Sequence, residues 1–339
     1  MSRKTKQNHI SSLELIAQFH KQNRFLIDSF LEYLKSIDKA KTTIWQYQHD
    51  LIIFFCWNVT DNENKPFTQI TKRDFTKFQG KAISDWAWSS NRMRRVKATL
   101  SSLSNYIVDI LDEEEEFSNY RSIVTKIKNP VNVPVREKTI FQPEELKSVL
   151  DRLVENNRLE LACMLSLAIN SARRKSELTR FKVSYFTKDC IKINGLFYRT
   201  PEKVQTKGRG SKGKLLNLYV IKAPFDPYLK LWLAEMERKG IQSEWLFPKR
   251  ANTAEHITDN TMDDWADQLS KLTGKSFYWH SIRHYATTQF VKIGVPDAII
   301  QKVVGWETID MVDDYNDMTP EEVLEEYFSK NQGVVDMGC

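Results

Sequence analysis

Hydrophobic residues recur at intervals of three and four along the first third of the chain, which is the spacing of amphipathic helices. We expect four helices there, over residues 10–36, 42–58, 71–82 and about 89–111. The third helix opens at Thr71 with Asp74 three residues later, a spacing typical of a capping box. An acidic run, Glu113–Glu116, follows the fourth helix and is expected to be a solvated end of this helical bundle.

The pattern changes at Asn129–Val135, which has two prolines and no helical period and therefore predicts an extended linker. Pro143 then suits the first turn of a helix. Further helices are predicted over 144–155, 158–171 and 176–182. Residues 183–222 alternate like strands, beginning with Tyr185 and Phe186, and are interrupted by the basic, glycine-rich turn Lys207–Gly213. Helices are expected again from about residue 226 to the end.

These elements predict a mainly α fold with a small antiparallel β-sheet (α+β), arranged as a helical domain followed by a domain of helices around the sheet. A length of 339 residues suits two domains. We expect an N-terminal tail at 1–20, a helical domain at 21–128, a linker at 129–140, a second domain at 141–322 and a C-terminal helix or tail at 323–339.

Charge and cysteine content narrow the possible classes of protein. The chain has 50 Lys and Arg against 44 Asp and Glu, a net charge of +6, which permits nucleic-acid binding without demonstrating it. Its four cysteines form no C-x-x-C pair, so we expect reduced thiols in a cytoplasmic protein. We see no signal peptide, no run approaching the ~20 apolar residues of a membrane span, no phosphate-binding loop and no metal-ligand cluster. We therefore expect no cofactor and no metal.

Four segments of the second domain carry candidate chemistry. They are Ser171–Leu178, the turn around Lys207, His280–Tyr285, and Gly305–Trp306 followed by Tyr315. Each segment alone is most simply explained as an ordinary ion pair, a solvated hairpin, a helix face or a surface tyrosine. Their order and spacing carry more weight, because Arg283 lies three residues after His280 and Tyr315 lies nine residues after Trp306.

Together the segments resemble the tyrosine recombinase family, which includes phage integrases, Xer proteins and Cre. The resemblance runs from about Phe141 to Tyr315, and less closely the N-terminal helices resemble the family's core-binding, DNA-binding domain. It implies a site-specific DNA recombinase or integrase of a phage or mobile element that cuts and rejoins strands through a 3′-phosphotyrosine intermediate. Such an enzyme needs neither ATP nor metal and acts on double-stranded DNA, as a tetramer on synapsed sites. It would lie in the cytoplasm of a bacterial or archaeal host, associated with the nucleoid.

The resemblance implies six catalytic residues, which are Arg174, Lys207, His280, Arg283, Trp306 and Tyr315. The two arginines would hold the non-bridging phosphate oxygens with permanently charged, planar guanidinium groups. Tyr315 would attack phosphorus, and a tyrosine with an ordinary pKa of about 10 needs help to lose its proton.

The remaining residues supply that help. His280 is the candidate base, and Lys207 is the candidate acid for the leaving 5′ oxygen. Trp306 can donate its indole N–H to a phosphate oxygen. Two further residues are expected to support the site. Glu177 would orient Arg174, and His284, the residue after Arg283, completes the His-x-x-Arg-His motif.

Several alternatives stay open. Arg173 is a rival for the first catalytic arginine, although Arg174 has the better spacing to Glu177. Lys203 and Lys212 are rivals for the active lysine. In addition, Asp313 and Asp314 precede Tyr315, where carboxylates near a phosphate are unfavourable unless they point away.

These departures from the family pattern keep another class of function in view, a DNA-binding regulator such as a phage repressor that has the recombinase fold without recombining. A type IB topoisomerase and a helical scaffold protein are further alternatives. The C-terminal helix could pack on its own protomer or on a neighbour.

The expected DNA contacts lie on two N-terminal helices. Arg92 and Arg95 share a face of the helix at 89–111, and Lys39, Lys41 and Thr43 lie at the start of the helix at 42–58. In the family the corresponding helices face the major groove, where basic side chains would contact phosphates. The ordinary explanation is a solvated basic face.

Overall fold

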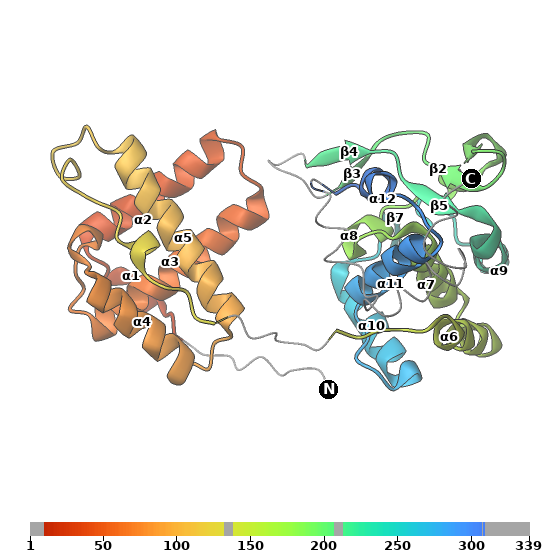
Figure 1. The fold of residues 1–339 in the computed structure, drawn as a ribbon, viewed down its shortest axis with the longest axis horizontal. Coiled ribbons are helices and arrows are strands. Elements are labelled where there is room, and N and C mark those ends of the chain that lie inside the picture. The colour runs from red at the N-terminus through yellow and green to blue at the C-terminus, as the bar shows by residue number, and fades with distance from the viewer. Residues whose placement is uncertain (1–9, 132–137, 207–212, 307, 309–339) are drawn as a thin grey trace, which may run out of the picture. The chain divides into compact units, whose positions relative to one another are not determined.

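The structure, a computed structural model, describes residues 10–131, 138–206, 213–306 and 308. These residues fall into two compact units, with the change of unit between residues 137 and 138 (Figure 1). The fold is mainly helical with small antiparallel sheets, so the predicted fold class is confirmed. The finer domain boundaries given above stay predictions. Among the described residues, no helix is both long and apolar enough to span a membrane.

The N-terminal unit consists of helices. They are α1 (Leu13–Ala17), α2 (Lys21–Ser36), α3 (Lys41–Asp61), α4 (Lys72–Ser84) and α5 (Ser90–Ile110), with short 3-10 turns at Phe67–Gln69 and Val124–Lys126. The helical period over 10–36 belongs to two helices, because α1 ends at Ala17 and His20 caps α2 by accepting a bond from the backbone N–H of Gln22. The capping box of Thr71 and Asp74 is confirmed.

The core of this unit is rich in aromatic rings. Phe54 is fully buried on α3 and contacts a group of rings from α3, α4 and the 3-10 turn between them, which are Phe55, Trp57, Phe67, Phe75 and Phe78. Such edge-to-face and stacked pairs add to the free energy of burying apolar surface. One buried carboxylate also joins α3 to α5, since Asp50 accepts bonds from Arg95 and Thr99.

The C-terminal unit mixes helices and short strands. Its helices are α6 (Pro143–Glu155), α7 (Leu159–Ser171), α8 (Lys175–Leu178), α9 (Lys222–Arg238), α10 (Asp259–Thr273), α11 (Trp279–Lys292) and α12 (Asp297–Val304). Its strands are β1 (Ile191–Lys192), β2 (Phe197–Arg199), β3 (Val204–Thr206), β4 (Lys214–Leu216), β5 (Tyr219–Ile221), β6 (Pro248–Lys249) and β7 (Asn252–His256). They form the antiparallel sheets β1–β2–β5, β3–β4 and β6–β7.

Four details of this unit differ from the sequence prediction. Tyr185 and Phe186 lie in a 3-10 turn rather than a strand, so that both rings pack around Phe181. The helix expected over 176–182 is only the four residues of α8. The helix expected from about 226 begins at Lys222. The hairpin β6–β7 falls where helices alone were predicted.

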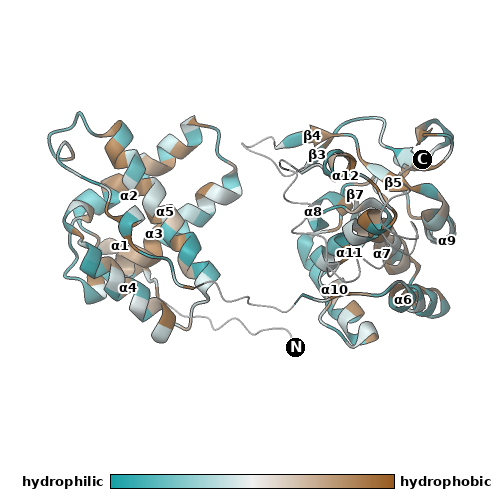
Figure 2. Cartoon of the chain, viewed as in Figure 1, coloured by the Kyte–Doolittle hydropathy of each residue, from teal (hydrophilic) through white to brown (hydrophobic). Residues whose placement is uncertain are grey.

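Helix α7 lies at the centre of the unit and is buried on almost every side. Figure 2 shows that many of the other helices combine hydrophobic and hydrophilic residues, as amphipathic helices do. Helices α9 and α11 both pack against α7. This arrangement fixes the C-terminal end of α7, from which the candidate site is built.

Candidate active site

The turn between α7 and α8 separates two consecutive arginines. Ala172 ends α7 with φ of 52°, in the left-handed region that a residue with a side chain rarely adopts. The chain then changes direction, so that Arg174 becomes the N-cap of α8. Arg173 is 1% exposed, whereas the side chain of Arg174 is 19% exposed. The two neighbours are therefore in different environments.

Glu177 is the buried carboxylate of the site. Its Oε2 accepts a bond of 3.2 Å from the backbone N–H of Arg174, and its Oε1 accepts one of 3.0 Å from Nη1 of that arginine. Its Oε2 also lies 3.9 Å from Nη1 of Arg283. One carboxylate thus contacts both arginines that the sequence nominated for the phosphate. A charged, hydrogen-bonded carboxylate restricts the rotamers of the guanidinium groups around it.

Helix α11 contributes the His-x-x-Arg-His segment. Arg283 is buried, with Nη1 donating to the carbonyl of Ala172 at 2.8 Å and Nη2 to that of Val304 at 3.4 Å. It therefore connects the end of α7 to the end of α12. His280 is exposed on the same helix, and its ring lies edge-to-face with that of His284 at 5.0 Å between centroids.

Helix α12 ends at Gly305, whose φ of 80° favours glycine. A Cβ built on Gly305 would lie 2.5 Å from Cδ1 of Leu216 on β4, so the turn and the β3–β4 hairpin touch where there is no side chain. Trp306 follows, buried, with its ring centre 5.4 Å from the guanidinium carbon of Arg283. A guanidinium near an aromatic face is a favourable cation–π arrangement.

Arg173 also reaches this turn, since its Nη2 donates to the carbonyl of Val303. Burial lowers the pKa of Arg173 to about 10, with the neighbouring Arg174 acting in the same direction and the carboxylate of Glu177 opposing them. A guanidinium with that pKa is still charged at neutral pH. The site therefore holds three positive guanidinium groups around one buried carboxylate.

The structure brings together Arg174, Glu177, Arg283 and Trp306, from the α7–α8 turn, α11 and the end of α12. Four residues of the predicted site remain: His280 and His284 lie on α11 with their rings in contact, and Lys207 and Tyr315 lie outside the described residues. Lys203 is exposed just before β3. Lys207 follows the last residue of β3 in sequence, but Lys207, Lys212 and Asp313–Tyr315 lie outside the described residues.

The DNA contacts predicted for the N-terminal unit lie in two settings. Lys39 and Lys41 are exposed at the start of α3, and Thr43 is half-buried beside them. The guanidinium of Arg92 covers the ring of Trp88 at 4.1 Å, and Arg95 bonds to Asp50. The two arginines on α5 thus have structural contacts of their own, which the helical spacing of the sequence did not reveal.

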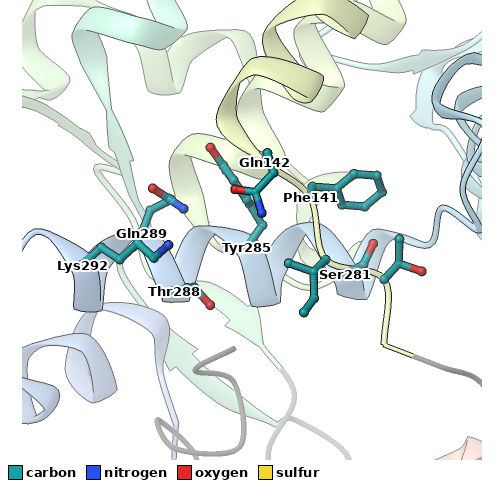
Figure 3. Close-up of a pocket in the computed structure, with 9 residues that line it drawn as sticks. Phe141, Gln142, Ser281, Tyr285, Thr288, Gln289 and Lys292 are labelled. Carbon is teal, nitrogen blue, oxygen red and sulfur yellow. The ribbon is translucent and has the colours of Figure 1, made fainter. Parts of the chain in front are cut away.

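A pocket beside α11 lies apart from this cluster. Figure 3 shows Ser281, Tyr285, Thr288, Gln289 and Lys292 of α11 facing the segment that holds Phe141 and Gln142. No residue predicted to be catalytic is among those that line it. We therefore place the candidate active site at the α7–α8 turn and the end of α12, rather than in this pocket.

Comparisons with known proteins identify relatives of the whole chain. YomM, an SPbeta prophage-derived recombinase-like protein of Bacillus subtilis (strain 168), is 27% identical over 279 residues, which cover 81% of this chain and 80% of that protein. The tyrosine recombinase XerA of Pyrococcus horikoshii is 25% identical and covers 89% of this chain and 92% of its own.

Solved structures share the fold. XerH site-specific recombinase bound to palindromic difH substrate matches with a TM-score of 0.65 at 15% identity, covering 91% of this chain and 96% of that one. A lambda integrase tetramer bound to a Holliday junction matches with a TM-score of 0.63 at 14% identity, covering 87% and 77%.

The model of the phage integrase family matches residues 139–322, which is more than half of the 339 residues. This range contains the whole of the cluster around Glu177 and also the sequence positions of Lys207 and Tyr315. The chain therefore belongs to the phage integrase family of tyrosine recombinases.

Proposed function

We propose that this protein recombines DNA at specific sites, cutting one strand with Tyr315 and rejoining it to a new partner. The observation that carries the proposal is the contact of one buried carboxylate, Glu177, with the two arginines that the family's pattern assigns to the phosphate. Preorganised positive charge is what phosphoryl transfer without a metal requires, because negative charge must be stabilised as it develops on the phosphate oxygens.

Strand cleavage forms one bond to phosphorus and breaks another. The phenolic oxygen of Tyr315 forms a bond to phosphorus, and the bond from phosphorus to the 5′ oxygen breaks. His280 accepts the phenolic proton, and Lys207 gives a proton to the leaving 5′ oxygen. Rejoining runs the same step in reverse, with a 5′ hydroxyl of the partner strand as nucleophile. The phosphotyrosine conserves the energy of the phosphodiester, so no nucleotide is hydrolysed.

The arginines and Trp306 act on the phosphate itself. Arg174 and Arg283 would each bind a non-bridging oxygen with planar N–H pairs. Trp306 would add an indole N–H donor. Glu177 is best placed to orient the two guanidinium groups, and we assign it and His284 a supporting role rather than contact with the reacting atoms.

The partner we propose is double-stranded DNA, held by phosphate contacts from Lys39, Lys41 and Thr43 at the start of α3 and from Arg92 and Arg95 on α5. The structures of XerH and lambda integrase named above are bound to DNA, and the latter is a tetramer on a Holliday junction. By analogy we propose a tetramer on two synapsed sites, acting at the nucleoid in the cytoplasm of its host.

The test uses duplexes from the DNA that flanks the protein's own gene, each with a nick at a different position. A nick just 3′ of the cleavage position releases a short strand that diffuses away, which traps the intermediate. We expect a protein–DNA adduct that survives denaturation and is sensitive to protease. Tyr315→Phe should bind the same duplex with equal affinity but form no adduct, because the ring is kept and the nucleophilic oxygen is removed.

The same assay decides the alternative of a DNA-binding regulator. Neither the family model nor the relatives named above support that alternative. Tight, sequence-selective binding by the unaltered protein without any adduct would nevertheless refute the recombinase proposal. An adduct that persists in Tyr315→Phe would support strand cleavage but show that another residue is the nucleophile.

A further inference from the structure

Arg173 is one of the largest fully buried side chains of the molecule, and the mechanism above does not use it. It lies between Ala172, which turns the chain, and Arg174, which would bind the phosphate. Its Nη2 donates to the carbonyl of Val303 in the last turn of α12. The buried guanidinium thus bridges two segments more than a hundred residues apart in the sequence.

Two nitrogens of this guanidinium, Nε and Nη1, have no hydrogen-bond partner among the residues that the structure describes. The carboxylate of Glu177, which is close to Arg173, already accepts a bond from Arg174 and lies 3.9 Å from Arg283. Burying a charge without full compensation is unfavourable, and apolar residues of similar volume often replace buried ions at no loss of stability. Arg173 is therefore a poor choice for stabilising the fold alone.

The position of Val303 suggests what the arginine does instead. The last carbonyls of a helix have no partner within it and carry its partial negative charge, which favours cations. Arg173 takes the carbonyl of Val303 and Arg283 takes that of Val304. Both backbone N–H groups of the following turn, those of Gly305 and Trp306, bond back to Gln301. The turn that leads toward Tyr315 is thus held by two guanidinium groups.

We propose that Arg173 is a positioning residue for strand cleavage: it fastens the end of α12 to the α7–α8 turn, so that Trp306 is held in register with Arg174. This inference rests on the proposed recombinase function. It assigns Arg173 no contact with the phosphate. Arg174 would bind the phosphate, whereas Arg173 bonds to the carbonyl of Val303.

The experiment compares Arg173→Leu and Arg173→Lys with the unaltered protein. Arg152→Leu is the matched control. Arg152, on helix α6, also donates to a backbone carbonyl of the same unit, that of Leu272 on α10. We would measure DNA affinity, the single-turnover rate of adduct formation at saturating protein, the melting temperature, and hydrogen exchange in a peptide covering Gln301–Trp306.

For Arg173→Leu we expect unchanged DNA affinity, an unchanged or higher melting temperature, faster exchange at Gly305 and Trp306, and a cleavage rate about 10- to 100-fold lower, the size of effect that a misplacement near 1 Å produces. Arg173→Lys keeps one donor for Val303 and should recover exchange protection and part of the rate. Arg152→Leu should change neither.

Two results would overturn the inference. One is an Arg173→Leu protein that cleaves as fast as the unaltered protein or shows unchanged exchange at Gly305 and Trp306. The other is a parallel loss of melting temperature, affinity and rate that Arg173→Lys does not rescue, which is what a merely structural role predicts. If the unaltered protein forms no adduct, the proposed function fails, while the exchange measurement still decides whether Arg173 holds the turn.

Discussion

The two units each bury a carboxylate that binds arginine, and the two arrangements differ in balance. In the N-terminal unit, Asp50 accepts two bonds from Arg95 and one from Thr99, at 2.9 to 3.2 Å. In the C-terminal unit, Glu177 bonds to Arg174 and lies close to Arg283, with Arg173 also nearby. Both carboxylates are 1% exposed. Asp50 thus bonds to Arg95 with Arg92 close by, and Glu177 contacts Arg174 and Arg283 with Arg173 close by.

The difference shows which buried pair is there for stability. Around Asp50, Arg95 and Arg92 both reach solvent, so water offsets their charges, and Thr99 donates a further bond to the carboxylate. Around Glu177, two positive charges remain in excess within a mostly buried cluster. Such an excess is unfavourable in the free protein and favourable once an anion is bound. A DNA phosphate would bring the missing negative charge, so we assign the second cluster to function.

Glu177→Gln should have the largest effect, because it leaves three guanidinium groups in a buried cluster without their carboxylate. We expect the free energy of unfolding to fall by about 3 kcal/mol. We also expect cleavage of bound DNA to slow by about 100-fold, since the arginines lose their orientation. Urea unfolding and single-turnover adduct formation measure the two quantities. A variant with the stability and the rate of the unaltered protein would show that the cluster does not depend on this carboxylate.

Asp50→Asn should have a smaller effect, on stability and on the DNA affinity that Arg95 contributes, rather than on the cleavage step. The side chain of Arg95 is 44% exposed and can turn to water, so we expect a loss of about 1–2 kcal/mol in the free energy of unfolding. The rate of cleavage from saturated protein–DNA complex should not change. A slowed cleavage step in this variant would contradict the division between a stabilising and a functional cluster.

Asp74→Asn offers the smallest effect, from a carboxylate with no excess charge around it. Burial raises the pKa of Asp74, but bonds from the backbone N–H and hydroxyl of Thr71 and the charge of Lys65 lower it more, so that it lies below its ordinary value. A lowered pKa means that this stabilisation is fully present above the unfolded value of about 3.9 and is lost as pH falls through the folded value.

We therefore expect Asp74→Asn to unfold about 1 kcal/mol more easily at neutral pH, the usual worth of a helix cap. The gap to the unaltered protein should shrink below about pH 4. Thermal melts between neutral and acidic pH measure it. A gap independent of pH would mean that the cap does not depend on the charge of Asp74.

The sequence predicted most helices because their hydrophobic period is local, and the capping box at Thr71 because its two partners are three residues apart. Residues far apart in sequence were harder. The separation of α1 from α2 depends on the cap that His20 forms, which the hydrophobic period does not reveal. The role of Asp50 depends on its bonds to Arg95 and Thr99 on α5. The hairpin β6–β7 was missed because its strands have two and five residues, too few for an alternation to stand out.

The site shows the same limit. The motif spacing nominated Arg174 and Glu177, whose contact the structure contains. The sequence left Arg173 as a rival for the first catalytic arginine, and its burial appears only in the structure. What no spacing could supply is its partner, the carbonyl of Val303, which is reached only after α7 and α12 have packed near one another.

The missing side chain of Gly305 has a mechanical consequence. Leu216 fills the space that a Cβ would need, so the β3–β4 hairpin rests directly on the turn after α12. In sequence, Lys207 extends from one of these elements and Tyr315 from the other. A residue with a side chain at position 305 would have to displace Leu216 and also adopt the positive φ of this turn. A substitution at Gly305 would therefore disturb the β3–β4 hairpin as well as the turn after α12.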